Sequence, residues 1–173
     1  MKNKINWRQL AEDVGSFENG QEHGSNTLAQ KAIENLIGEE AIRDAVDYYI
    51  NGGPGSELAR FVIWQIHPIS AMQYCYEIYK SERDIEEKRS AVELLRVAAD
   101  HRVVPWIKDF LSDPDKSIQL WGFGILDQLL WSELVDEEEV SWLLELAERS
   151  TNEHLLERVD FVKGFLKQRN EHE

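Results

Sequence analysis

The chain has 173 residues, a length typical of one compact domain. Hydrophobic residues make up 42% of it, so it can bury a core without disulfides or a metal, and a disordered chain is excluded. Its 33 acidic and 19 basic residues give a formal net charge of −14, which argues against nucleic-acid binders and peripheral membrane proteins because such a surface repels phosphates.

Two other features limit where the chain acts. Its longest apolar runs span only a few residues, so no transmembrane helix is expected, and the basic start at 1–7 lacks the apolar stretch of a signal peptide. Cys75 is the single cysteine, which excludes an internal disulfide or a multi-cysteine metal site. We therefore expect a reducing, cytoplasmic compartment.

Apolar residues recur with the 3.6-residue period of an amphipathic helix in ten segments. These predicted helices lie at 5–14, 27–37, 39–51, 55–66, 69–81, 85–99, 103–112, 115–131, 137–149 and 152–168. Short connections between them predict that sequential helices are antiparallel. No segment alternates as a half-buried strand does; 15–26 is the one long loop, and the tail at 169–173 is expected to fray.

A three-residue pattern, which we call the ladder, recurs along the chain at intervals of 30, 29 and 31 residues. It consists of an apolar residue, a small or branched residue four positions later, and another apolar residue four positions after that. Its copies are Leu28–Ala32–Leu36, Leu58–Val62–Ile66, Glu87–Ala91–Leu95 and Ile118–Gly122–Leu126, with a weaker Thr151–Leu155–Val159. One helix pair cannot bury its apolar stripe alone, so neighbouring pairs are expected to stack.

The sequence therefore predicts an all-α fold, a right-handed α-solenoid of about five antiparallel helix pairs. It forms a single domain over 1–173, with the repeats mainly in 27–166. At Gly122, the missing side chain is expected to let the preceding helix approach closely. The alternative is an irregular bundle of the same helices.

One unit carries a family resemblance. Val104 and Pro105 open its first helix, Asp113 and Pro114 form a turn after Leu111, and the ladder follows. This unit resembles the HEAT-like repeat, particularly the short form of phycobilisome-lyase-type proteins. Two departures from the family are Gln119 and Ala59, which stand where an arginine is common, and a third is the Gly-Gly-Pro-Gly turn at 52–55. The resemblance implies a fold more than a function.

In such solenoids the second helix of each pair lines the concave, partner-binding side. Positions two, six and nine after each ladder start point away from the expected core, at 100° per residue. From these positions we select eleven candidate partner-binding residues: Arg60, Trp64, His67, Arg89, Glu93, Arg96, Leu120, Asp127, Glu153, Glu157 and Asp160.

Tryptophan and arginine are enriched at interface hot spots, so Trp64 and the arginines Arg60, Arg89 and Arg96 are the expected anchors. Two alternatives remain open. A register slip of one residue would place Trp64 in the core. The arginines could also pair with Glu57 and Glu93 on a solvated face.

No catalytic motif is present. The five histidines lack metal-ligand spacing, the glycines at 52–55 lack the lysine of a phosphate loop, and there is no nucleophile elbow. Cys75 is most simply a small apolar filler, with a reactive thiol as the alternative. The acidic run at 136–139 is expected to stabilise a helix N-terminus, with a divalent cation as the alternative. We expect no enzyme activity, no metal and no cofactor.

The sequence favours a non-enzymatic, bacterial-type module that binds another protein. Small acidic HEAT-like proteins look similar to immunity proteins, so the partner could be a basic toxin, which acidic side chains would attract. The alternatives are a scaffold for a housekeeping partner, an accessory subunit of a bilin lyase, and a HEAT-like DNA glycosylase. The last would need a positive groove that the charge balance does not provide.

Overall fold

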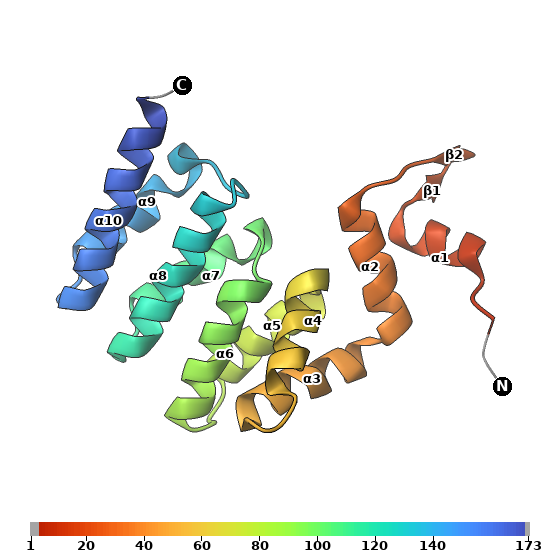
Figure 1. Ribbon diagram of the computed structural model, residues 1–173, viewed down its shortest axis with the longest axis horizontal. Coiled ribbons are helices and arrows are strands. Elements are labelled where there is room, and N and C mark those ends of the chain that lie inside the picture. Colours follow the sequence, from red (N-terminus) through yellow and green to blue (C-terminus); the bar gives the residue numbers. More distant parts are fainter. Residues whose placement is uncertain (1–3, 172–173) are drawn as a thin grey trace. The chain divides into compact units, whose positions relative to one another are not determined.

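The computed structural model describes residues 4–171, and within that range the protein is all-α, as the sequence predicts (Figure 1). The elements are α1 (Trp7–Val14), β1 (Phe17–Glu18), β2 (Gln21–Glu22), α2 (Asn26–Ile37), α3 (Glu39–Asn51), α4 (Ser56–Ile66), α5 (Ile69–Lys80), α6 (Ile85–Ala98), a 3₁₀ turn (His101–Val103), α7 (Val104–Leu111), α8 (Lys116–Trp131), α9 (Glu137–Glu148) and α10 (Glu153–Asn170).

Every α-helix lies within two residues of its predicted bounds. The end of the chain differs, because α10 continues to Asn170 where fraying was expected from 169. The last residues of the predicted tail, 172–173, and the first three residues of the segment assessed for a signal peptide lie outside the described residues. Within 4–171, no helix combines the length and the apolar character needed to cross a membrane.

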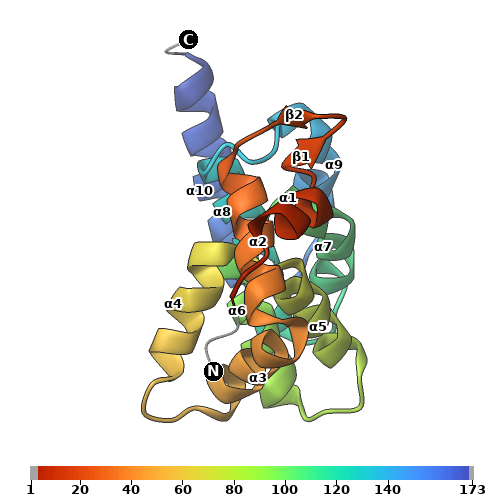
Figure 2. The ribbon, with the colours of Figure 1, turned by 90° about the vertical axis from the view of Figure 1, so that its right-hand side faces the viewer.

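The chain forms two compact units, Met1–Tyr74 and Cys75–Glu173. In the first unit, α1 packs on α2, α2 on α3, and α3 on α4 (Figure 2). The side chains of α2 also tie this unit together: Gln30 donates to the carbonyl of Gln65 at 3.2 Å, and Glu34 accepts from the amides of Ile69 and Ser70 at 3.2 and 2.9 Å. Glu34 therefore caps the start of α5.

The predicted loop at 15–26 contains a short hairpin, which sequence analysis missed. Phe17 lies opposite Glu22 in an antiparallel pair. Asn19 and Gly20 form the turn with φ of 52° and 78°, the backbone that a two-residue hairpin needs and that Asn-Gly favours. Strands of two residues are too short to show alternation, so only the Asn-Gly pair could have revealed them.

In the second unit, α6, α8 and α10 lie in one layer, with α7 and α9 behind them (Figure 1). The helix α8 packs on α6, α7 and α10, and α9 packs on α7 and α10. The buried ladder residues here are Ala91, Leu95, Ile118, Gly122, Leu126, Leu155 and Val159. The predicted ladder register is thus confirmed in the second unit, except at the polar starting residues Glu87, which is half-buried, and Thr151, which is exposed.

Candidate partner-binding surfaces

The helix α4 exposes an apolar face in the first unit. Its members Leu58, Phe61, Val62 and Trp64 are 68%, 51%, 42% and 45% exposed, and we call them the α4 apolar face. Spacings of three and four residues place most of them on one side of the helix. The rings of Phe61 and Trp64 meet edge to face, 6.0 Å apart. Trp64 is therefore exposed, and the alternative of a core position is wrong.

This face corrects the predicted ladder of the first unit. Leu58 and Val62 were expected in the core but are exposed; α4 buries the predicted Ile66 and, in place of those two, Ile63. In α2, Leu36 is likewise exposed. The buried side of α4 is rotated from the expected one because α4 packs along α3. A ladder in sequence shows which residues could be buried, whereas the neighbouring helix decides which of them are.

Arg60 and His67 flank the α4 apolar face without extending it. Arg60 Nη1 lies 3.3 Å from Glu57 Oε2, which is the helix-surface pairing that the sequence left open. Its Nε is buried and has no acceptor within the described part of the chain. His67 ends α4 in the left-handed conformation, with φ of 42°, and its amide donates to the carbonyl of Ile63 at 2.9 Å.

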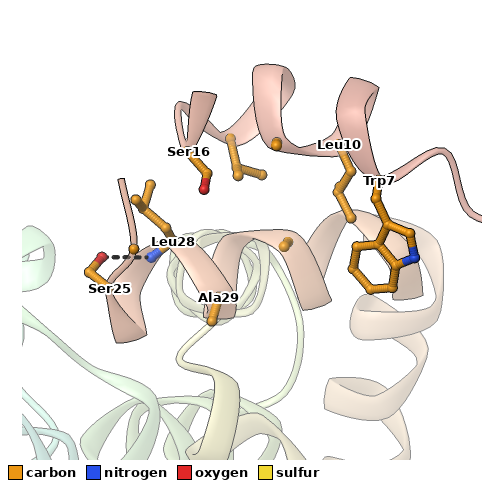
Figure 3. Close-up of a pocket in the computed structure, with 10 residues that line it drawn as sticks. Trp7, Leu10, Ser16, Ser25, Leu28 and Ala29 are labelled. Atoms are coloured by element: carbon orange, nitrogen blue, oxygen red, sulfur yellow. Dashed lines mark hydrogen bonds between the residues drawn. The ribbon is translucent and has the colours of Figure 1, made fainter. Parts of the chain in front are cut away.

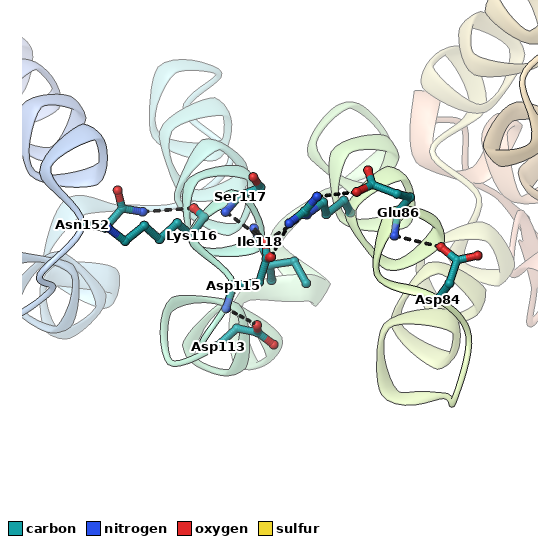
Figure 4. Close-up of polar contacts among 9 residues, drawn as sticks. Asp84, Glu86, Asp113, Asp115, Lys116, Ser117, Ile118 and Asn152 are labelled. Carbon is teal, nitrogen blue, oxygen red and sulfur yellow. Dashed lines mark hydrogen bonds and ion pairs between the residues drawn. The ribbon is translucent and has the colours of Figure 1, made fainter.

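In the second unit, Arg89 binds the neighbouring helix. Its Nη2 lies 2.5 Å from Asp115 Oδ2 and its Nε 3.1 Å from Asp115 Oδ1, and it also contacts Glu86 (Figure 4). Asp115 caps α8, since its Oδ1 accepts from the amides of Ser117 and Ile118, both at 3.0 Å. The hydrogen bond from Arg89 lowers the pKa of Asp115. Arg89 thus joins α6 to α8.

A neutral bridge continues this row of contacts from α8 to α10. The buried Asn152, just before α10, donates to the carbonyl of Lys116 at 3.0 Å (Figure 4). It also donates to Gln119 Oε1 at 3.1 Å. Gln119 in turn donates to the carbonyl of Asp113 at 2.7 Å. Gln119 therefore forms an amide bridge between α8 and the start of α10. Sequence analysis noted the departure but not its partner, which lies 33 residues away.

Two more predicted residues contact neighbouring helices. The guanidinium of Arg96 lies over the ring of Trp121, 5.1 Å from its centre. Asp127 on α8 accepts from Arg158 on α10 at 2.5 and 3.1 Å. Glu93 and Leu120 lie on α6 and α8 and are partly exposed. Most side chains of the face predicted to bind a partner are therefore engaged in non-covalent contacts with one another or with neighbouring helices.

The exposed part of this layer is α10. The predicted residues Glu153, Glu157 and Asp160 are all exposed, and we call them the acidic stripe. Beside them, Phe161 on α10 is 61% exposed, and Trp131 at the end of α8 is 60% exposed. The ring of Trp131 packs against Phe165 at 4.5 Å. Sequence analysis missed these aromatic residues, although their spacing along α8 and α10 was visible.

The structure thus divides the predicted residues between two surfaces. Arg60, Trp64 and His67 lie on or at the end of α4, in the first unit. The other eight lie on α6, α8 and α10, in the second unit: Arg89, Glu93, Arg96, Leu120, Asp127, Glu153, Glu157 and Asp160.

A pocket of about 210 Å³ lies between α1 and α2 (Figure 3). Its walls are mostly apolar, and they include Trp7, Leu10 and Leu28. Both of its serine hydroxyls are engaged: Ser16 donates to the carbonyl of His23 at 2.6 Å, and Ser25 accepts from the amide of Leu28 at 3.2 Å. The pocket therefore offers shape and apolar contact, without a group arranged for catalysis.

Other chemistry is sparse in the described part of the chain. No group of three or more histidine, cysteine, aspartate or glutamate side chains is placed to hold a metal ion between residues 4 and 171. Cys75 is buried. The acidic run at 136–139 includes the first turn of α9, where carboxylates stabilise the positive end of the helix dipole.

Comparisons with family models, with curated proteins and with solved structures found no match to this chain.

Proposed function

We propose that this chain is a non-enzymatic, cytoplasmic protein–protein interaction module built as a right-handed solenoid of HEAT-like helix pairs. The second unit supports the repeat. Asp84, Asp115 and Asn152 stand at the N-cap positions of α6, α8 and α10, and contacts at the same ends join α6 to α8 and α8 to α10 (Figure 4). The side chains of Asp84 and Asp115 cap their helices, whereas that of Asn152 bridges to α8, and such repeated contacts at the same ends of successive helices are consistent with a stacked repeat.

The α4 apolar face carries the proposal that the module binds a protein. Large apolar side chains fill two turns of this helix and remain in contact with solvent. Contiguous exposed apolar surface of this kind is typical of interaction sites, because covering it releases water. Phe61 and Trp64 offer rigid aromatic rings, the side chains that dominate interface hot spots.

The charge of the chain defines the class of partner. At −14, with the acidic stripe exposed on α10, the protein attracts a basic partner from a distance and speeds their encounter. A basic toxin, neutralised by this chain as by an immunity protein, fits that requirement. Its cationic surface would meet carboxylates, and its apolar contacts would supply the slow dissociation.

Capture of partners by tagged protein tests this proposal. The variant F61S/W64S removes both aromatic rings of the α4 apolar face, and W7S/W142S is the matched control because it removes two exposed aromatic rings elsewhere. We expect quantitative mass spectrometry to find a basic protein recovered with the wild type and the control but depleted at least about tenfold with F61S/W64S. Identical recoveries with all three proteins, or recovery that is insensitive to salt, would contradict the proposal.

A further inference from the structure

Arg96 differs from Arg89 and Arg158, two other arginines of its layer. Arg89 on α6 and Arg158 on α10 each bind a carboxylate of α8, Asp115 and Asp127 respectively. Within the described chain, Arg96 has no ion pair, although the protein carries 33 acidic residues. Glu93, one turn earlier on the same helix, is not bonded to it.

Packing nevertheless fixes the side chain of Arg96. Its guanidinium lies over the ring of Trp121, 5.1 Å from the ring centre. Its aliphatic stem lies against Gly124, where an added Cβ would stand 3.0 Å from Arg96 Cδ and 3.7 Å from Cγ. Its Nε is buried without an acceptor. Gly124 therefore makes room for the stem, and Trp121 supports the charged group.

The two terminal nitrogens of Arg96, Nη1 and Nη2, are its remaining hydrogen-bond donors. Neither has a hydrogen-bond acceptor among residues 4–171, and the Nε is the one atom of this side chain that is both buried and unpartnered there. The Nη1 and Nη2 donors are therefore not fully buried, and the side chain as a whole is partly exposed. A guanidinium already held in place loses little conformational freedom on binding, and its planar fork matches a carboxylate.

We infer that Arg96, supported by Trp121 and Gly124, is a preorganised binding site for a carboxylate. A single cation in a protein of net charge −14 suits one carboxylate better than a polyanion, which the rest of the surface repels. The carboxylate comes from an aspartate or glutamate side chain or from the C-terminus of a chain. This inference rests on the proposed function for the source of the carboxylate, but the site is testable without the partner.

Nuclear magnetic resonance on the full chain tests the site directly. The reporters are the Arg96 Nε–H and Trp121 indole N–H signals, followed at constant ionic strength. One probe is the N-methylamide of N-acetylaspartate, which has only a side-chain carboxylate, and the other is N-acetylalanine, which has only a terminal one. We expect saturable shifts with at least one probe, and the stronger probe identifies the source. Saturation is absent for Arg102, whose guanidinium already binds Asp100.

Two variants and a control decide the outcome. R96K keeps the charge but loses the fork, so binding reported by the Trp121 indole should weaken about tenfold. G124A keeps the arginine but displaces its stem, so it should also weaken binding, whereas G164A, where an added Cβ meets nothing, should not. Linear shifts, equal shifts in R96K and wild type, or tighter binding of inorganic phosphate would each overturn the inference. Loss of capture by F61S/W64S would still support the proposed function in that case.

Discussion

Gly122 lies against Phe110 so closely that no side chain fits between them. A Cβ atom on Gly122 would stand 2.3 Å from Phe110 Cβ, well inside the 3.5–4.0 Å at which carbon atoms normally meet. Phe110 is fully buried and packs edge to face against Tyr79 at 4.8 Å. The close approach of α7 that the sequence predicted at Gly122 is confirmed, and it sets the distance between α7 and α8.

Replacing Gly122 by alanine should therefore destabilise the protein. A methyl group in a helix normally stabilises it by about 0.5–1 kcal/mol relative to glycine, but here it must separate two helices, which costs about 1–3 kcal/mol. Gly164→Ala is the matched control, because an added Cβ there meets nothing within 4 Å. In urea unfolding we expect opposite shifts of the midpoint, downward for G122A and upward for G164A. Equal shifts for the two variants would show that the Phe110 contact is relaxed at little cost.

Helix positions followed from local patterns, because glycines, prolines and capping residues act within a few residues of themselves. The ladder register was right where both neighbouring helices are present, as at Ile118 and Leu126, which are buried by α7 and other helices of the second unit. It was wrong at Leu58 and Val62, which face solvent. Periodicity identifies an apolar side, but burial depends on which helix covers that side.

The candidate surfaces were harder to predict than the fold. The sequence placed Arg89, Arg96 and Asp127 on one face, but it could not show that each has a partner on the neighbouring helix of the layer, between 25 and 31 residues away. Such partners follow from the rotation and height of one helix against another. The exposure of Trp64, by contrast, was predicted correctly, because it depends mainly on the position of that residue on its own helix.

Asp115 should contribute to stability in two separable ways, as the cap of α8 and as the partner of Arg89. Asp115→Ala removes both and should cost about 1–2 kcal/mol, whereas Asp115→Asn keeps the cap and should cost less. Because the pKa of Asp115 is lowered in the folded state, its ionic contribution is present above about pH 4 and is lost as the pH falls through the lowered value.

Urea unfolding of these variants between pH 2 and 7 provides the measurement. D115N should show a shallower loss of stability in acid than the wild type, because it has no carboxylate to protonate. The control is D44N, an exposed acidic residue of α3. Parallel acid profiles for D115N and the wild type would mean that the contact with Arg89 adds no net stability.

The neutral bridge between Gln119 and Asn152 should be convertible into a charged one. Asn152→Asp alone places a carboxylate beside two acceptors, the carbonyl of Lys116 and Gln119 Oε1, and removes the amide donor that both receive from Asn152, although Gln119 Oε1 still accepts from the Ser150 hydroxyl at 3.3 Å. We expect a loss of about 1–3 kcal/mol. Adding Gln119→Arg should recover part of it, since an arginine could bind the new carboxylate as Arg89 binds Asp115. A double-mutant cycle measures this coupling, and additive effects would contradict the expected pairing.

Two phenols, the half-buried Tyr76 and the buried Tyr79, should limit stability in alkali. Burial first, and then the hydrogen bond to Asp109 at 2.5 Å, raises the pKa of Tyr76 to about 12, and burial with a hydrogen bond to Asp113 also raises that of Tyr79. The folded state favours the neutral phenols, so their contribution to stability is complete below about pH 10 and is lost as the pH rises toward the folded-state pKa.

Tyr76→Phe keeps the ring that stacks on Trp106 at 4.7 Å but removes the hydroxyl. It should therefore remove one of the phenols that ionise last in the ultraviolet titration, and stability should fall less steeply as the pH rises. The control is Tyr48→Phe, on an exposed ring, which should leave the ionisation step at high pH unchanged. If the absorbance change at high pH is as large in Y76F as in the wild type, the raised pKa belongs to another tyrosine.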